Sequence, residues 1–273
     1  IGEIDIDPNH NKIDLKHKRF LQSTINSEEV PLSVHLTAYH CVLLYPNRFV
    51  AINLINEEIA CNDLLGLYHG VPKQLVWDGI NNNLWYFTST NIFGCHIWNE
   101  DRKIWKILLE KKDFKNALKL TENNPKNHDL VNQRIAYDYL INKEYMKAAE
   151  LYASTNAYFE PTVMHFIDLD SKYLIEYLTR KLVFYKNDLI QKHIIIMWII
   201  DSYLIELCNE DNKIAVLKCQ LKTFLRWSLV KKSIEQYPNV YYKIIEHYGA
   251  GDFVIFIANL LNDSEKIIIY HLN

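Results

Sequence analysis

The hydrophobic and polar positions of the chain change their period near residue 100. Before that point, short apolar or alternating runs predict β-strands, because successive side chains of a strand point to opposite faces. These runs are Val34–Leu36, Cys41–Tyr45, Phe49–Leu54, Glu58–Cys61, Leu75–Trp77, Leu84–Thr88 and Ile92–Trp98. From Asp101 onward, apolar residues recur every three or four positions, which predicts amphipathic α-helices.

The first four predicted strands indicate one blade of a β-propeller. Pro46-Asn47 and Asn56-Glu57 separate the last three strands with hairpin-like spacing. Four short antiparallel strands in succession are typical of a blade, and the next three predict a second blade. The alternating segment Gly2–Asp7 is a candidate for an extra strand. Because propellers have about four to eight blades, either two sheets stack openly or earlier blades have been lost.

The helical part contains an internal repeat. Lys112–Leu120 matches Lys143–Leu151 through the pattern K-[DE]-[FY]-x-x-A-[LA]-x-L, and a weaker third copy runs from Asn262 to Ile269. The acid favours the helix dipole, the aromatic ring fills the space between paired helices, and the alanine lets the partner helix approach closely. The repeat predicts an α-solenoid of tetratricopeptide or clathrin-repeat type. The alternative is two amphipathic helices that look alike by chance.

These patterns give an α+β multidomain fold, with a partial β-propeller of about two blades at 1–98 and an α-solenoid at 99–273. The first residue is Ile1, and the chain ends soon after the third copy begins. A solenoid normally ends in a polar capping repeat. We therefore expect the chain to be truncated at both ends.

Composition supports the helical interpretation and excludes several functions. The seven glycines are absent between Cys95 and His247, as expected for helices, in which glycine is unfavourable. Pro125, Pro161 and Pro238 fall inside this gap, and each marks the first turn of a helix. No glycine-rich phosphate loop is present. The net charge of −3 gives no general attraction to nucleic acid, and the five cysteines form no CxxC pair, which indicates reduced thiols.

None of the candidate chemical groups is predicted to be catalytic, cofactor-binding or metal-binding. His35, His40 and Cys41 are interpreted as blade surface residues rather than metal ligands, and neither HExxH nor GxSxG occurs. Asp168 and Asp170 form a possible carboxylate pair, but Asp170 or Ser171 more simply caps a helix starting near Lys172. The sequence therefore indicates that the chain is not an enzyme.

Four further segments have more than one reading each. The basic clusters Lys16–Arg19 and Lys231-Lys232 suit a lipid headgroup, an acidic partner or a solvated face. Gly249–Gly251 suits a helix C-cap better than a nucleotide site. The apolar run Ile194–Ile200, in the predicted helix Asp188–Leu207, is either solenoid core or a groove for a partner.

Residues from Pro31 onward resemble the deep orange family of vacuolar protein sorting-associated protein 18. The most specific segment is Tyr152–Glu160. The other matching segments follow in the family's order, and they are Pro31–His40, Leu43–Arg48, Asp101–Trp105, Asp113-Phe114 with Ala117, Tyr177–Leu182 and Trp198–Leu204.

This resemblance implies a non-catalytic scaffold subunit of HOPS and CORVET, the complexes that tether endosomes and lysosomes before SNARE-mediated fusion. It implies vacuolar protein sorting-associated proteins 11, 16, 33 and 41 as partners, SNAREs as indirect partners, and peripheral attachment to the cytoplasmic face of late endosome, lysosome or vacuole membranes. Neither nucleic acid nor a cofactor is expected. Family members carry more propeller blades and a RING zinc domain, so RING activities are not assigned to these residues.

Two other classes of function stay open. Clathrin and coatomer chains share the propeller-plus-solenoid layout, so a vesicle-coat subunit is the alternative scaffold. An enzyme with a cleft between blades and helices is the third class, and a tightly bound metal or nucleotide would favour it.

Overall fold

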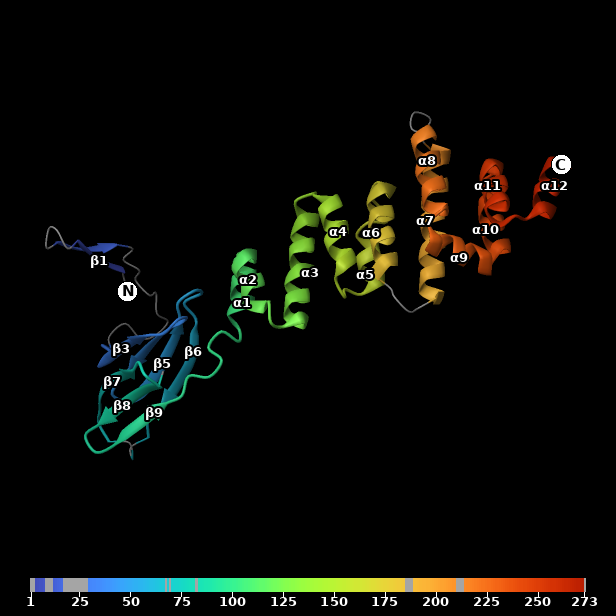
Figure 1. The fold of residues 1–273 in the computed structure, drawn as a ribbon. Coiled ribbons are helices and arrows are strands. Elements are labelled where there is room, and N and C mark those ends of the chain that lie inside the picture. The colour runs from blue at the N-terminus through green and yellow to red at the C-terminus, as the bar shows by residue number, and fades with distance from the viewer. Residues whose placement is uncertain are drawn as a thin grey trace. The chain divides into compact units, whose positions relative to one another are not determined.

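The structure is a computed structural model of the 273-residue chain (Figure 1). It describes residues 3–7, 12–16, 29–66, 68, 70–81, 83–184, 189–209 and 214–272. Contacts divide the chain into two compact units, Ile1–Asn123 and Asn124–Asn273. The domains 1–98 and 99–273 divide it by type of secondary structure instead, and their boundary stays a prediction.

The described residues of the first unit contain three antiparallel sheets with the strand orders β1-β2, β3-β4-β5-β6 and β7-β8-β9. The strands are β1 (Glu3–Asp7), β2 (Lys12–Lys16), β3 (Ser33–Leu36), β4 (His40–Leu44), β5 (Arg48–Asn53), β6 (Ile59–Leu64), β7 (Pro72–Asp78), β8 (Asn83–Thr88) and β9 (Ile92–Cys95). All seven predicted blade strands and the extra strand β1 are confirmed. β2 was not predicted, although its sequence alternates as that of β1 does.

The two larger sheets pack face to face, as propeller blades do. β7 lies against β3 and β4. The residues buried between the sheets are Val42, Leu44, Leu75, Leu84 and Tyr86. The opposite face of β4 and β5 is also apolar, and its buried residues are Cys41, Leu43, Tyr45, Val50 and Ile52. A sheet that is apolar on both faces is what the inner layers of a stack require, so the sequence pattern and the packing agree on a partial propeller.

One strand is shorter than predicted. The apolar run suggested a strand up to Trp98, but β9 ends at Cys95. The reason is that the partner strand ends there, because Cys95 pairs with Leu84 and β8 begins only one residue before it, at Asn83. After β9, the Glu100 carboxylate accepts a hydrogen bond from Tyr39 N–H of the β3–β4 turn at 2.8 Å.

The helices follow one another along the rest of the chain, and Figure 1 shows those of the second unit side by side. They are α1 (Ile104–Glu110), α2 (Phe114–Thr121), α3 (Pro125–Ile141), α4 (Tyr145–Ser154), α5 (Phe159–Met164), α6 (Ser171–Phe184), α7 (Leu189–Asn209), α8 (Ile214–Leu225), α9 (Ser228–Gln236), α10 (Pro238–His247), α11 (Gly251–Leu261) and α12 (Ser264–Leu272). The three prolines lie in first helical turns as predicted. Among the described helices, none is both long and apolar enough to cross a bilayer.

The repeat pattern encodes the turn between two helices of a hairpin. Lys112, Lys143 and Asn262, the first residues of the three copies, have φ values of 60°, 61° and 58°, and Gly249 has 65°. In all four turns the next residue donates its N–H to a carbonyl five positions back, at 2.8–3.3 Å. This is a Schellman ending, in which the left-handed residue stops one helix and its successor caps the next.

The alanines of the repeat lie in the core, as predicted. Ala117 and Ala148 are fully buried, and the second unit has one continuous apolar core that extends from α3 to α11. The Gly249–Gly251 segment is a turn between α10 and α11, which confirms the C-cap reading. Gly251 is closely packed, since a Cβ there would lie 1.6 Å from the Tyr270 hydroxyl of α12 and the Tyr270 ring would have to move.

Candidate interaction site

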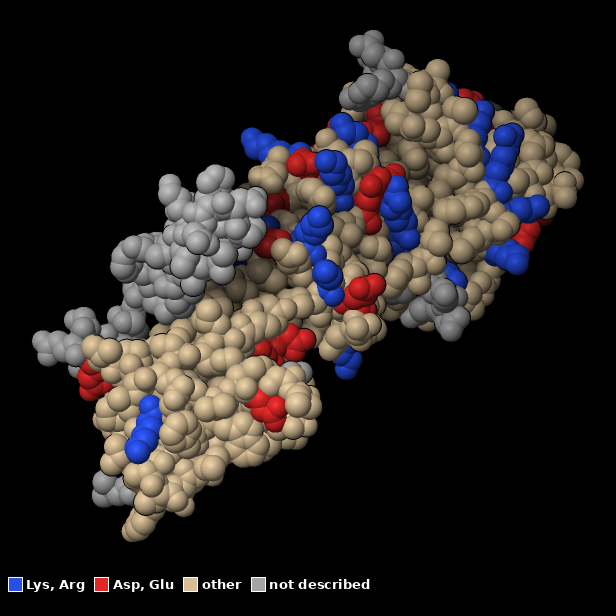
Figure 2. Space-filling view, turned by 60° about the vertical axis from the view of Figure 1, so that its left-hand side comes forward, with Lys and Arg blue, Asp and Glu red and all other residues tan. Residues whose placement is uncertain are grey.

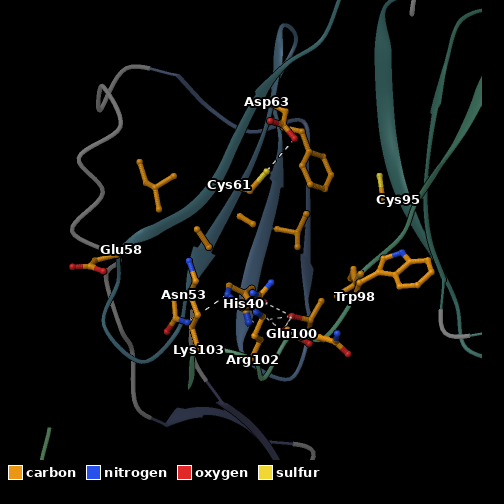
Figure 3. A pocket seen from close by; sticks show the side chains of 18 of the residues that line it. His40, Asn53, Glu58, Cys61, Asp63, Cys95, Trp98, Glu100, Arg102 and Lys103 are labelled. Carbon is orange, nitrogen blue, oxygen red and sulfur yellow. Dashed lines mark hydrogen bonds and ion pairs between the residues drawn. The ribbon is translucent and has the colours of Figure 1, made fainter. Parts of the chain in front are cut away.

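Glu100 is the centre of a hydrogen-bond network in the first unit (Figure 3). Its Oε1 accepts bonds from Tyr39 N–H at 2.8 Å, from His40 Nδ1–H at 2.9 Å and from the Thr37 hydroxyl. The other ring nitrogen of His40 lies 3.4 Å from the Asn53 amide nitrogen. Because that amide donates, the proton of the neutral imidazole belongs on Nδ1. The network therefore fixes the ring orientation and tautomer of His40.

The chemistry of this network is positional. Burial alone would raise the pKa of Glu100, but the hydrogen bonds from Thr37, His40 and Tyr39 outweigh it and hold the pKa below its ordinary value. A carboxylate that orients an imidazole also occurs in hydrolases, where the far ring nitrogen faces a nucleophile. Here it faces Asn53, whose Oδ1 accepts bonds from the N–H groups of the following turn. Among the described residues, the far ring nitrogen therefore faces an amide rather than a hydroxyl or thiol.

A cavity of about 830 Å³ adjoins this network. Figure 3 shows Cys61 and Asp63 on the wall formed by β6, with Cys95 and Trp98 across from them. Glu100, Arg102 and Lys103 lie together at another end of the cavity. The lining combines apolar side chains with a few charged ones, which suits the binding of a peptide or another small partner.

The two thiols of the cavity are not activated. Burial raises the pKa of Cys61 to about 11. The hydrogen bond from Cys61 Sγ to the Asp63 carboxylate, at 3.1 Å, adds to this rise. Burial also raises the pKa of Cys95 to about 11. Since the thiolate is the nucleophilic form, these raised pKa values disfavour nucleophilic chemistry at Cys61 and Cys95 near neutral pH.

Of the residues considered as metal ligands, His40 and Cys41 are not on the surface, so their interpretation as blade surface residues was wrong. Cys41 is fully buried and only 16% of the His40 side chain is exposed. The alternation of side chains did not indicate this burial, because both faces of the sheet are covered. The His35 ring stacks on Trp77 of the neighbouring sheet at 4.9 Å. Within the described ranges, no group of three His, Cys, Asp or Glu residues is placed to hold a metal ion.

The other sequence candidates have simple structural partners. The Asp170 carboxylate accepts a bond from Lys172 N–H at 3.2 Å, which confirms it as a cap of α6. Asp168 is exposed and lies outside that cap. Lys231 lies 3.8 Å from Glu235 on the surface of α9. Of the cluster Lys16–Arg19, only the backbone of Lys16 is described.

Sequence reasoning missed the polar groups that tie the helices of the second unit together. Lys181 is 2% exposed and donates to the Thr155 carbonyl at 2.7 Å, which joins α6 to the end of α4. Burial lowers the pKa of this lysine. The signal was present, because Lys181 belongs to the apolar stripe of its helix.

A second polar cluster joins three helices. His193 Nδ1 of α7 lies 2.9 Å from Ser233 Oγ of α9 and 2.8 Å from the Tyr241 hydroxyl of α10. The two hydroxyl oxygens are 2.9 Å apart. The sequence offered no signal for this cluster, since its members are separated by many residues.

The long helix α7 contributes to the solenoid core, and the alternative of a groove for a partner stays a prediction. Its buried residues Ile195, Ile196, Ile199, Ile200 and Leu204 belong to the core. Ile194, Trp198 and Ile205 are 44%, 39% and 42% exposed. One side of the helix is therefore core, and the other keeps an apolar surface.

Blades of antiparallel strands that lead into helical hairpins define a protein of the β-propeller and α-solenoid class. Within that class, two models of a particular family match the chain. The Pep3/Vps18/deep orange beta-propeller domain matches residues 1–97, and the first half of the VPS18 alpha-solenoid domain matches residues 102–263. The chain belongs to the Vps18 (Pep3, deep orange) family, which confirms the resemblance read from its segments.

Curated relatives agree with this assignment. A vacuolar protein sorting-associated protein 18 homolog of Danio rerio is 26% identical over 249 residues, which cover 88% of this chain and 26% of that protein. The vacuolar membrane protein pep3 of Schizosaccharomyces pombe is 26% identical over 270 residues, which cover 94% of this chain and 30% of that protein. Vacuolar sorting protein 18 of Arabidopsis thaliana is also 26% identical, with 89% and 26% covered. The chain thus spans less than a third of these relatives.

Proposed function

We propose that the chain is a non-catalytic scaffold segment of the HOPS and CORVET tethering complexes, and that it contributes to vesicle docking, SNARE-mediated fusion and vacuolar or lysosomal protein transport. Its place would be the cytoplasmic face of late endosome, lysosome or vacuole membranes, in peripheral association. The observation that carries this proposal is the family match across both the blades and the solenoid. The relatives' names refer to vacuolar sorting and the vacuolar membrane.

Physical features support a scaffold role over an enzymatic one. A solenoid stacks hairpins into an extended surface, which suits several protein partners at once. The apolar residues left exposed on α7 are available on that surface. In the first unit, the far ring nitrogen of His40 faces the Asn53 amide, and burial favours the thiol form of Cys61 and Cys95. The proposed partners are vacuolar protein sorting-associated proteins 11, 16, 33 and 41.

A fusion reaction tests this role. Purified chain added in excess to isolated vacuoles or lysosomes of the source organism should occupy partner subunits and inhibit fusion in a dose-dependent way. A matched helical-repeat protein of unrelated family should leave fusion unchanged. Fusion that proceeds normally at saturating chain would contradict the proposal. Closed cages of the purified chain in electron micrographs would favour a vesicle coat instead.

A further inference from the structure

The stretch from Ile214 to Ile234, which spans α8 and most of α9, contains basic residues but no Asp or Glu. Its basic residues are Lys218, Lys222, Arg226, Lys231 and Lys232. Figure 2 shows a row of blue side chains, with few red ones among them, on the part of the second unit drawn at the right. Because the net charge of the chain is −3, this basic stretch is a local feature of the solenoid.

Three of these cations form a stripe along α8. Lys218, Lys222 and Arg226 follow one another at intervals of four residues, so they lie on one side of the helix, about 6 Å apart along its axis. Arg226 comes directly after the last residue of α8, and its N–H still donates to the Lys222 carbonyl at 3.2 Å. The stripe therefore continues through the helix end. Its first member, Lys218, is neutralised by Asp252 of α11 at 3.0 Å.

The other two cations share one aromatic ring. Lys222 Nζ lies 5.7 Å from the centroid of the Phe256 ring of α11, and Arg226 Cζ lies 5.2 Å from it. A cation within about 6 Å of an aromatic face is attracted to it, so this ring holds both side chains in place. Among the described residues, neither cation has a carboxylate partner, and Asp252, the one acidic residue in the sequence of α11, is engaged by Lys218. The pair is thus positioned without a counter-charge from the described chain.

The seam between α8 and α11 that holds this pair is formed by two helices that are described from end to end. The two helices lie against each other, and their apolar sides are already covered in the solenoid core. Phe256 lies beside that core and is only partly buried. The cations therefore lie on an outer surface of packed helices, where they are available to a partner.

The spacing and the backbone of this surface indicate what kind of partner fits. Two cations about 6 Å apart are complemented by two carboxylates at the same spacing, which a helix provides when its acidic residues are four positions apart. An extended segment gains no backbone hydrogen bonds here, because helices use their backbone groups internally. A membrane surface fits less well, since electrostatic attachment to lipid takes clusters of about four to eight basic residues. An acidic helix is therefore the favoured occupant.

We propose that an acidic helix of a partner protein docks on the seam between α8 and α11, with two carboxylates four residues apart opposite Lys222 and Arg226. Phe256 is a positioning residue, because its ring keeps the two cations at the spacing that the carboxylates require. This site rests on the proposed scaffold role and deepens it, because it names the chemistry of one partner contact.

A synthetic helical peptide tests the site directly. The probe is fluorescein-labelled Ala-Gln-Ala-Ala-Glu-Leu-Ala-Gln-Glu-Leu-Ala-Gln-Ala-Ala-Gln-Ala, with blocked ends, titrated against the whole chain in low-salt buffer and followed by fluorescence anisotropy. Saturable binding that weakens as salt is added is expected. Lys222→Glu and Arg226→Glu should each weaken it at least fivefold. Lys126→Glu makes the same charge change on an exposed residue of α3, and should alter binding less than twofold.

A second peptide separates the fit of the two charges from general attraction. It exchanges the second glutamate with the alanine two places before it, so that the same two charges point to different sides of the helix. It should bind at least threefold more weakly than the first peptide. Phe256→Leu keeps both cations but removes the ring, and should reduce this difference between the two peptides to less than twofold, which a loss of overall charge would not do.

Several results would overturn the proposal. These are absence of saturable binding, equal weakening by Arg226→Glu and Lys126→Glu, and equal affinity for the two peptides. A chain that ignores both peptides but binds vesicles of phosphatidylcholine and phosphatidylserine, and loses that binding in Arg226→Glu, would identify a lipid surface as the occupant instead. Inhibition of fusion by the chain together with a failed peptide titration would remove this site and leave the scaffold role standing.

Discussion

Lys143 offers a measurable test of the hairpin turn that recurs along the solenoid. It is exposed, and its φ of 61° lies in the left-handed region, where a residue with a Cβ costs about 1–2 kcal/mol relative to the right-handed one. Glycine avoids this cost but loses more chain entropy on folding, about 0.5–1 kcal/mol. Lys143→Gly should therefore stabilise the second unit by roughly 0.5–1 kcal/mol.

Gly249 is the matched control, because it occupies the same turn position at φ 65°. A Cβ added there would meet nothing within 4 Å, so Gly249→Ala changes backbone preference and not packing. It should destabilise the unit by about 1 kcal/mol, which lowers Tm by roughly 2–4 °C for a unit of this size.

Urea unfolding followed by circular dichroism at constant m-value measures both effects. Opposite shifts of the midpoint are expected for Lys143→Gly and Gly249→Ala. A midpoint that falls for Lys143→Gly, or does not move for Gly249→Ala, would refute the reasoning, because the left-handed conformation would then carry no energetic consequence.

Three further predictions concern single contacts. The pKa of Glu100 is lower in the folded protein than its ordinary 4.5, so its ionised form stabilises folding above that pH, and this contribution is lost as pH falls through the lowered pKa. Glu100→Gln should therefore flatten the acid limb of a curve of stability against pH. An unchanged acid limb would contradict the hydrogen-bond network. Lys181→Met keeps the buried volume but removes the hydrogen bond to the Thr155 carbonyl. The free energy of unfolding, measured by denaturant titration, should therefore fall by about 1–3 kcal/mol. No loss would mean that a water molecule replaces the lysine as the donor. Gly251→Ala should lower Tm through the clash with Tyr270, and Tyr270→Phe in the same chain should restore part of the loss; equal Tm values for all three proteins would rule out the close contact.

Much of the fold was predictable because local periodicity and tertiary packing agree. The strands of both blades follow from alternation, and Pro125 and Pro238 mark helix starts because proline suits the first helical position. The K-[DE] start of the repeat was read only as a helix signal, although Lys112 and Lys143 also form the turn. Glycine commonly takes this position, so a turn with lysine in its place is hard to recognise in the sequence.

The remaining features of the fold and of the site depend on contacts between residues that are distant in the sequence, and the hydrophobic period does not report such contacts. His40 and Glu100 are 60 residues apart in the sequence, and the residues next to them do not indicate this contact. The burial of Cys41 depends on a second covered face of the sheet. β9 ends at Cys95 because its partner strand β8 begins opposite that point, although the apolar run continues to Trp98.

Sedimentation velocity of the purified chain mixed with each of vacuolar protein sorting-associated proteins 11, 16, 33 and 41 tests the scaffold claim most directly. A scaffold role predicts a faster boundary that contains both proteins in at least one of the four mixtures, and no such boundary with an unrelated solenoid protein. Separate boundaries in all four mixtures, each at the rate of the isolated protein, would contradict it.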